Sequence, residues 1–385
     1  MIPYGRQNIS DDDIKTVVDV LKSDFLTQGP LVPKFENVVC DYVGSKYGVA
    51  VNSGTSALHI ACLSLGLKSG DWLWTTPVTF VASANCGLYC GAQVDFVDID
   101  SNSWNISIDQ LTKKLELAKK ENKLPKILVA VHLCGLPCDM ESLYQLSQEY
   151  GFYVIEDACH AIGGKYQNAP IGNCQYSDIT VFSFHPVKTI TTGEGGMAVT
   201  NNKKLAEKMR LLRSHGITRE PGLMTSVPDG PWYYQQIELG FNYRMTDLQA
   251  ALGISQLKRL DTFVAKRHEI AKKYNEFLSE LPLQLPNHTD GKYSGMHLYV
   301  IRVKKNHTDK THRQIFEFLR DKGIGVNLHY IPVHTQPYYK EMGFKQGDFK
   351  EAEAYYQEAI SLPMFPDLTD EDIKTIVATV SKSLQ

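Results

Sequence analysis

Short apolar runs recur along the first 250 residues, separated by stretches in which apolar side chains follow helical spacing. An unbroken run such as ILVAVHL (127–133) is typical of a strand buried on both faces of a parallel sheet. The expected strands are 47–51, 71–75, 93–99, 127–133, 152–158, 177–184 and 197–200. The expected helices begin near residue 33 and cover 56–65, 80–91, 108–120 and 139–151. This alternation predicts an α/β fold with a mostly parallel sheet.

The pattern changes after TDLQAALGISQL, where Thr246 and Gln249 have the spacing of a helix capping box. A long, charged, amphipathic helix is expected over 258–281. The remaining strands (297–303 and 325–330) and helices (313–323 and 350–360) fit a smaller α+β unit. We therefore expect an N-terminal arm (1–30), a large domain (31–255) and a small C-terminal domain (256–385).

The composition is globular: 385 residues, 43% hydrophobic and 22% charged, with a net charge of -3. No basic excess is available to bind nucleic acid or an anionic membrane, so neither partner is expected. The start, MIPYGRQNISDDDIKTV, lacks the apolar segment of a signal peptide, and no apolar run approaches the ~20 residues that span a bilayer. We expect a cytoplasmic protein that acts on small molecules.

The eight cysteines are too few for a disulfide scaffold in a chain of this length. Cys86 and Cys90, like Cys134 and Cys138, are four positions apart, which raises the question of a metal. Neither pair has the two-residue spacing of a zinc knuckle, and the first lies on an expected buried helix face. We expect unreactive core thiols and no metal site.

Polar residues follow the first expected strand in the stretch NSGTS, directly before a helix. Gly54 lets the backbone approach a ligand, while the hydroxyls of Thr55 and Ser56 stand beside the free amides of the first helical turn. Such a stretch can bind a phosphate. It can equally be a simple helix N-cap.

Candidate catalytic or binding residues also follow two later strands. Asp157 ends VIED, with His160 three residues on, although a carboxylate there could cap the next segment. His185 and Lys188 follow ITVFSF, and a lone loop lysine is usually solvated. The glycine cluster after Lys188 precedes a short strand rather than opening a helix, so it is a poor dinucleotide fingerprint.

The three groups together favour a specific cofactor, because the carboxyl ends of parallel strands meet at one edge of the sheet. A phosphate site, a strand-end acid and a lysine match pyridoxal 5'-phosphate (PLP). Lys188 would bind its aldehyde as a Schiff base, and Asp157 would keep its ring nitrogen protonated.

The motifs NSGTSALH, TPVTFVASAN, EDACHAIGG, SFHPVKTITTGEGGMAVT, GFNYRMTDLQAALG and HYIPVH resemble the DegT/DnrJ/EryC1/StrS nucleotide-sugar aminotransferases, which have PLP-dependent transferase fold type I. The resemblance covers nearly the whole chain. The stretches SDFLTQGP, HYIPVHTQPYY and SLPMFP are most similar to the branch that serves pseudaminic acid biosynthesis. Its members move the amino group of L-glutamate, which becomes 2-oxoglutarate, to C4 of a UDP-linked 4-keto sugar.

The resemblance also implies roles for the matching positions. Gly54, Thr55 and Ser56, helped by Ser183, would bind the cofactor phosphate, and Asp157 would pair with the ring nitrogen. Lys188 would be the catalytic lysine that carries the cofactor and transfers protons.

Three further positions have implied roles and open alternatives. Phe80 would stack on the pyridine ring, or be plain core. His160 would lie near the phenolic oxygen, or be a hydrogen-bonded interior histidine. Asn242 would reach the phosphate of the neighbouring subunit's cofactor, which implies a homodimer with shared active sites, or be a turn residue.

The nucleotide sugar is the least specified part of the resemblance. Segment 219–237, rich in proline and aromatic residues, either covers the site or is a surface excursion. Packing or helix-dipole roles remain open for several candidates. The candidate substrate residues are Tyr4, Arg6, His185, Arg244, His329 and Tyr330.

Three alternative functions are weighed against this one. A C4-aminotransferase could act on another UDP-, dTDP- or GDP-linked 4-keto sugar. Dehydratase relatives replace the cofactor lysine with histidine, whereas Lys188 is present here. A non-catalytic PLP-binding regulator would need a DNA-binding module, and no basic helix-turn-helix segment is visible.

Overall fold

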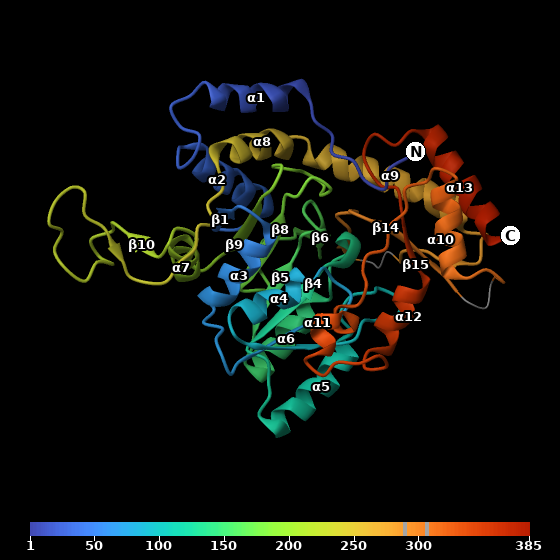
Figure 1. Cartoon of the computed structure of the whole chain (residues 1–385), viewed down its shortest axis with the longest axis horizontal. Helices are drawn as coiled ribbons and strands as arrows, with labels where there is room; N and C mark the ends of the chain where they lie inside the picture. The colour runs from blue at the N-terminus through green and yellow to red at the C-terminus, as the bar shows by residue number, and fades with distance from the viewer. Residues whose placement is uncertain (288–290, 305–307) are drawn as a thin grey trace.

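The computed structural model describes residues 1–287, 291–304 and 308–385. Its centre is one large sheet (Figure 1). The strands of this sheet are β1 (Tyr47–Val51), β2 (Trp72–Thr75), β3 (Gln93–Phe96), β4 (Ile127–Val131), β5 (Tyr153–Asp157), β8 (Ile179–Ser183) and β9 (Gly196–Thr200). They lie in the order β1-β9-β8-β5-β4-β2-β3. Strand β9 pairs antiparallel with β1 and β8, and the other neighbouring strands pair in parallel. The predicted mostly parallel α/β sheet is confirmed.

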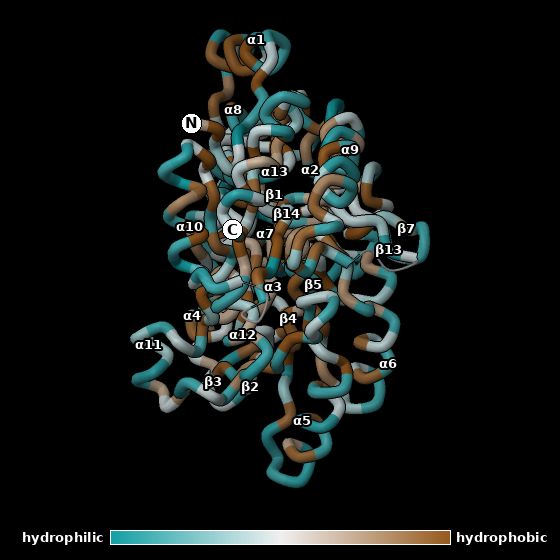
Figure 2. The backbone as a smooth tube through the Cα atoms, turned by 90° about the vertical axis from the view of Figure 1, so that its right-hand side faces the viewer, coloured by the Kyte–Doolittle hydropathy of each residue, from teal (hydrophilic) through white to brown (hydrophobic). Residues whose placement is uncertain are grey.

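Helices cover both faces of this sheet. On one face lie α3 (Gly54–Ser64), α4 (Ala82–Tyr89) and α7 (Lys203–Arg213), and on the other α2 (Leu31–Val43), α5 (Ile108–Glu121) and α6 (Met140–Tyr150). Along β4, Ile127 and Val129 pack toward the first set, whereas Leu128 and Ala130 pack toward the second. This double burial explains why the β4 sequence is apolar at every position, and β4 is brown in Figure 2.

The C-terminal part is built on a second, antiparallel sheet of β12 (Leu283–Gln284), β14 (Tyr299–Val303) and β15 (Ala359–Leu362). A hydrophobic cluster joins this sheet to α9 (Leu260–Leu278), α10 (His312–Asp321) and α13 (Asp370–Leu384). A further cluster packs Val78 and Trp104 of the N-terminal part against Val300 and Tyr355. The exact limits of the arm and the two domains stay predictions.

Short elements complete the chain. They are β6 (Lys165–Tyr166), β7 (Ala169–Pro170), β10 (Ile217–Thr218), β11 (Gln235–Gln236), β13 (Lys292–Tyr293), α11 (Pro337–Lys340), α12 (Lys350–Glu358) and the 3-10 turns η1 (Leu133–Gly135) and η3 (Val333–Thr335). No helix within the described ranges is both long enough and apolar enough to cross a bilayer.

Two features differ from the sequence expectations. The arm contains a helix, α1 (Asp11–Leu21), which starts at a Ser10 capping box and lies along α8 (Asp247–Leu257) (Figure 1). The strand expected over 325–330 is wrong. Only isolated bridges occur there, because Gly325 N–H donates to Ile2 O and Asn327 N–H donates to Ser361 O. The expected Thr246–Gln249 capping box does open α8.

Segment 219–237 starts just after β10 and runs to the end of β11. In Figure 1 it projects to the left, away from the large sheet. It carries exposed apolar side chains, including Val227 (86% exposed) and Trp232 (72% exposed). Within one chain, segment 219–237 is therefore a surface excursion, the second of the two alternatives that its sequence left open.

Candidate active site

A cavity of about 640 Å³ opens at the carboxyl ends of β1, β5 and β8. The start of α3, the start of α4, the loop between β8 and β9, and two residues of the C-terminal part form its wall. The candidate residues that line it are Gly54, Thr55, Ser56, Phe80, Asp157, His160, Ser183, His185, Lys188, His329 and Tyr330. Strand ends separated by more than 100 residues in the sequence therefore form one site.

The start of α3 is a capped helix terminus that faces the cavity. Ser53 is the N-cap, and its Oγ accepts the Ser56 N–H at 3.1 Å. Ser56 Oγ donates to Asn52 Oδ1 at 2.7 Å. The amides of Gly54 and Thr55 have no acceptor within their own helix, because they belong to its first turn. The helix-cap and phosphate-site interpretations of this stretch are thus compatible, because Ser53 caps the helix while the amides of Gly54 and Thr55 remain free to bind an anion.

Two glycines allow the backbone around this terminus to pack closely. A Cβ at Gly54 would lie 3.0 Å from Ser183 Cβ. A Cβ at Gly196 would lie 2.3 Å from Ser53 O, a backbone atom that cannot rotate away. Gly196, the first residue of β9, thus makes room for the start of α3, which places Ser183 Oγ beside the free amides.

Asp157 ends β5 and is 6% exposed at the cavity. Ser83 Oγ donates to its Oδ2 at 2.6 Å, and the Cys159 N–H donates to its Oδ1 at 3.2 Å. Ser83 in turn shares a 2.7 Å hydrogen bond with the Thr79 hydroxyl. These contacts fix the orientation of the carboxylate while it still lines the cavity.

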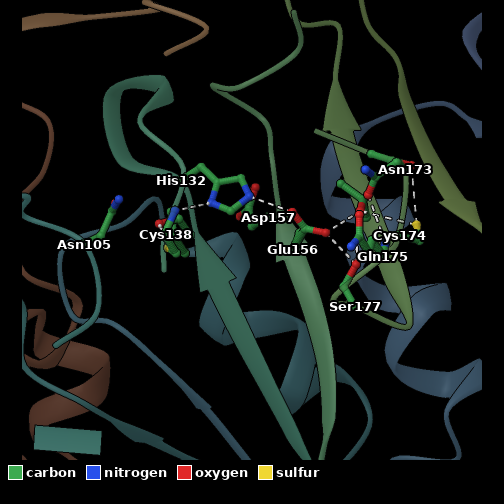
Figure 3. A network of polar contacts seen from close by, with 12 residues as sticks. Asn105, His132, Cys138, Glu156, Asp157, Asn173, Cys174, Gln175 and Ser177 are labelled. Atoms are coloured by element: carbon green, nitrogen blue, oxygen red, sulfur yellow. Dashed lines mark hydrogen bonds and ion pairs between the residues drawn. The ribbon is translucent and has the colours of Figure 1, made fainter. Parts of the chain in front are cut away.

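The residue before Asp157 is held on the opposite side of the strand. Figure 3 shows Glu156 between His132 and Ser177. The Cys138 N–H donates to His132 Nδ1 at 3.1 Å, so His132 donates from Nε2 to Glu156 over 2.8 Å. Burial alone would raise the pKa of Glu156, but hydrogen bonds from His132, Ser177 and others outweigh burial and lower it. This network ties β5 to its surroundings directly behind Asp157.

Lys188 lies in the loop between β8 and β9, which is anchored from both ends. Phe184 is fully buried against Phe35, and Thr191 Oγ1 donates to the Phe184 carbonyl at 3.0 Å. Burial lowers the pKa of the Lys188 amine, although the nearby Cys159 and Asp157 oppose this effect. Within the ranges that the structure describes, no acceptor or carboxylate pairs with Lys188 Nζ. Lys188 is therefore a cavity-lining amine with a weakened preference for the charged form.

His160 lines the same cavity as Lys188 and contacts Tyr330 of the C-terminal part. Its Nε2 lies 3.0 Å from the Tyr330 hydroxyl, and its buried Nδ1 has no hydrogen-bond partner among the described residues. Burial, together with the charge of Lys188, lowers the pKa of His160 well below its usual value. The same two causes lower the pKa of His329 to about 4. Both rings are therefore neutral at physiological pH.

The sequence matches the DegT/DnrJ/EryC1/StrS aminotransferase family over residues 7–381. The chain belongs to this family. The predicted resemblance is thereby confirmed over nearly the whole length. The protein is an aminotransferase of the group that modifies nucleotide sugars, and it has the fold of PLP-dependent aminotransferases.

Curated relatives and solved structures agree with this assignment. The Bacillus subtilis spore coat polysaccharide biosynthesis protein SpsC is 39% identical over 98% of this chain and 96% of its own. The UDP-4-amino-4,6-dideoxy-N-acetyl-β-L-altrosamine transaminase of Campylobacter jejuni is 37% identical over 100% of this chain and 98% of its own. Helicobacter pylori PseC, an aminotransferase of pseudaminic acid biosynthesis, superposes with a TM-score of 0.91 at 32% sequence identity. The superposition covers 100% of this chain and 99% of the PseC chain. Streptococcus pneumoniae Spr1654 has been solved in PLP and PMP forms.

Four of the candidate residues do not line the cavity of this aminotransferase. Tyr4 lies near it, with its ring 5.6 Å from the His329 ring. Arg6 and Asn242 are exposed, while Arg244 pairs with Val51 through an isolated β-bridge. Within one chain, Tyr4 thus contacts one of the cavity-lining candidates without lining the cavity, and the other three lie outside it.

The structure also bears on the alternatives that the sequence left open for Phe80 and His160. Phe80 is 58% exposed on the wall of the cavity, so the core alternative for this residue is wrong. Among the described residues, His160 Nδ1 has no hydrogen-bond partner, so this side chain is not a fully hydrogen-bonded interior histidine.

The sequence did not single out Ser83, Cys159 or Glu194. Ser83 holds Asp157, and the other two residues line the cavity. Ser83 lies in the first turn of α4, and its N–H donates to the carbonyl of Phe80, the candidate just before the helix. Cys159 and Glu194 lie in turns, where no periodic pattern indicates direction.

Substituting Gly196→Ala in this aminotransferase should displace the start of α3. The new Cβ meets the Ser53 backbone, and overpacking of this kind costs ~1–3 kcal/mol. We expect a lower unfolding midpoint in urea and weaker PLP binding by fluorescence titration. Gly222→Ala is the matched control, because nothing lies within 4 Å of its Cβ position. Equal behaviour of the two variants would contradict this account of the cavity wall.

Proposed function

We propose that this aminotransferase uses PLP bound to Lys188 to move the amino group of L-glutamate to C4 of UDP-2-acetamido-2,6-dideoxy-β-L-arabino-hex-4-ulose, a UDP-linked 4-keto-6-deoxy-N-acetyl hexose. This reaction belongs to pseudaminic acid biosynthesis. The observation that carries the proposal is the Lys188 amine, which shares a cavity with Asp157 and the start of α3 and has no partner in the described part of the chain. The C. jejuni and H. pylori relatives support the choice of sugar.

The residues of the cavity fit this cofactor. The free amides of Gly54 and Thr55, with Ser183 Oγ nearby, suit a phosphate at a helix N-terminus. The partly exposed Phe80 offers a ring face. The unpartnered Nδ1 of His160 can bind a phenolic oxygen. When bound, PLP condenses with amines and accepts the electron pair left by a broken Cα–H bond.

The chain supplies the proton chemistry. Asp157, held by Ser83 and by the Cys159 N–H, keeps a proton on the pyridine nitrogen. Lys188 has a lowered pKa, so its free amine could take the proton from the Cα of glutamate and deliver it to the C4' carbon of the cofactor. In the second half-reaction the same amine would move a proton in the reverse direction, from C4' to C4 of the sugar. Neutral His160 does not compete for that proton, since its pKa is far below physiological pH.

A second candidate function differs only in the identity of the nucleotide sugar. The SpsC relative is at least as similar as the C. jejuni transaminase, at 39% against 37% identity, and its name refers to a spore coat polysaccharide. The cavity residues that contact a nucleotide would decide between UDP-, dTDP- and GDP-linked 4-keto sugars. We propose the UDP-linked sugar as the substrate.

We also infer that the working unit is a homodimer with shared active sites. Asn242 is exposed and lies outside its own cavity. The projecting segment 219–237 exposes Val227 and Trp232, side chains that a second copy would cover. Each cavity would then receive Asn242 from the partner.

Replacing the lysine tests the function directly. Lys188→Ala and Lys188→Arg should abolish glutamate-dependent release of 2-oxoglutarate, a loss of at least ~10⁴-fold because proton transfer and covalent binding are both lost. The visible absorbance of the bound cofactor should also shift. Lys165→Ala, an exposed lysine outside the cavity, should behave as wild type. Wild-type turnover in Lys188→Ala would contradict the assignment, and no half-reaction in the wild type would favour the regulator.

An assay of UDP-, dTDP- and GDP-linked 4-keto sugars with glutamate tests the sugar. We expect the UDP-linked N-acetyl sugar to have the highest kcat/KM, by about tenfold or more if the site hydrogen-bonds its base. A preference for a dTDP or GDP sugar would support the second candidate and contradict the first.

Mixed dimers test the shared site. Lys188→Ala and Asn242→Ala should each be nearly inactive alone. After the subunits are exchanged at equal amounts, half of the dimers carry one site with both native residues, so about one quarter of wild-type activity should return. The measurement is activity before and after exchange. No recovery, with exchange shown by differently sized tags, would contradict the shared site.

A further inference from the structure

Tyr330 and His160 are 170 positions apart in the sequence and contact each other at the cavity. The Tyr330 hydroxyl lies 3.0 Å from His160 Nε2. The two rings are nearly parallel, with 19° between their planes and 6.0 Å between their centroids. A hydrogen bond of this kind needs a hydrogen on one of its two atoms, and the atom that carries it determines the tautomer of His160.

The surroundings of the Tyr330 hydroxyl make it the donor in this hydrogen bond. Burial raises the pKa of the hydroxyl well above its usual value, so it keeps its hydrogen at neutral pH. In the part of the chain that the structure describes, its hydrogen-bond partner is His160 Nε2 alone. If Nε2 carried a hydrogen instead, the hydroxyl would lack an acceptor and the buried Nδ1 would lack a donor. Donation from Tyr330 therefore leaves one unsatisfied group rather than two.

The single hydrogen of the His160 ring is then on Nδ1. The ring is neutral at physiological pH, because burial and the charge of Lys188 lower its pKa well below the usual value. A neutral imidazole has one N–H, and Nε2 accepts the hydrogen of Tyr330. The buried Nδ1–H has no acceptor among residues 1–287, 291–304 and 308–385. Buried donors are nearly always hydrogen-bonded in native proteins, so we expect a molecule other than the chain to supply the acceptor.

The neighbouring ring of His297 does not supply that acceptor. Its centroid lies 4.5 Å from that of His160, with 47° between the ring planes. The Nδ1 of His297 is also buried and has no hydrogen-bond partner within the described ranges. Burial, together with His160, Lys188 and other neighbours, lowers the pKa of His297 well below its usual value, so this ring is neutral too. His297 therefore packs against His160 without fixing its tautomer.

Contacts in the C-terminal part hold the backbone next to Tyr330. The Tyr355 hydroxyl, on α12, donates to the carbonyl oxygen of His329 at 2.9 Å. The Nδ1 of His329 lies 2.8 Å from the hydroxyl oxygen of Ser361, which belongs to β15. Tyr355 and Ser361 are both fully buried. The residue before Tyr330 is thus fixed by α12 and by the small sheet, and Tyr330 contacts His160 from this support.

We propose that Tyr330 is a positioning residue that fixes His160 as the Nδ1–H tautomer, so that His160 donates a hydrogen bond to the phenolic oxygen of PLP. The opposite tautomer would place a lone pair against that oxygen, and two acceptors repel each other. The tautomer follows from the chain alone, whereas its role toward the cofactor rests on the proposed use of PLP. His160 is then a fixed donor, and Lys188 is the group that moves protons.

Nitrogen-15 NMR of enzyme with labelled histidine measures the tautomer, because a ring nitrogen that carries a hydrogen resonates far upfield of a bare one. The signals of His160 are those that disappear in His160→Gln. In the wild type we expect the hydrogen on Nδ1, both before and after PLP is added. In Tyr330→Phe before PLP is added, a fraction of the molecules should carry it on Nε2, since no hydroxyl then donates to that atom. Tyr356→Phe is the matched control, because this exposed tyrosine of α12 lies outside the cavity.

A fluorescence titration with PLP measures the effect on the cofactor. Tyr330→Phe should raise the Kd of PLP about two- to tenfold, which is the loss expected when one hydrogen bond is weakened or broken. Tyr356→Phe should bind PLP as tightly as the wild type. Circular dichroism checks that each variant is folded.

Two results would overturn the role of Tyr330. One is a hydrogen on Nε2 of His160 in the wild type, and the other is a Tyr330→Phe variant whose tautomer and PLP affinity both match the wild type. Failure of the wild type to bind PLP would contradict the proposed function together with the donor role, whereas a hydrogen on Nε2 would contradict this inference alone.

Discussion

This active site is arranged around the Lys188 amine, which has no hydrogen-bond or ionic partner among the residues that the structure describes. Lys188 Nζ lines the cavity near Asp157 and Cys159, and burial weakens its hold on a proton. An ionisable group in such an unfavourable environment is typical of a functional site. The loop that carries this lysine is anchored at Phe184 and Thr191.

The remaining parts of the site follow from how the backbone surrounds that amine. Gly54 and Gly196 let α3, β8 and β9 approach closely enough to place free amides beside Ser183. On the other side, β5 presents Asp157 to the cavity while Glu156 points away into the network that Figure 3 shows. Because successive strand residues face opposite sides, one neighbour can anchor the strand while the other serves the cofactor.

The sequence predicted the large sheet well, because strands such as β1 and β4 are apolar at nearly every position. It also predicted that Asp157 and Lys188 meet, since both follow strands of one parallel sheet. It missed the 3.0 Å contact between His160 and Tyr330, which are 170 positions apart. The strand expected over 325–330 failed for a related reason, because that backbone bonds to Ile2 and Ser361 in remote segments. Periodicity reports which side of an element is buried, not which distant segment covers it.

The most direct test of the central claim is chemical trapping of the lysine. The PLP-loaded enzyme is reduced with borohydride and digested, and the modified peptide is sequenced by mass spectrometry. The account predicts a stable pyridoxyl group on Lys188, and prior incubation with excess glutamate should prevent it. A pyridoxyl group on another lysine, or none at all, would contradict the account.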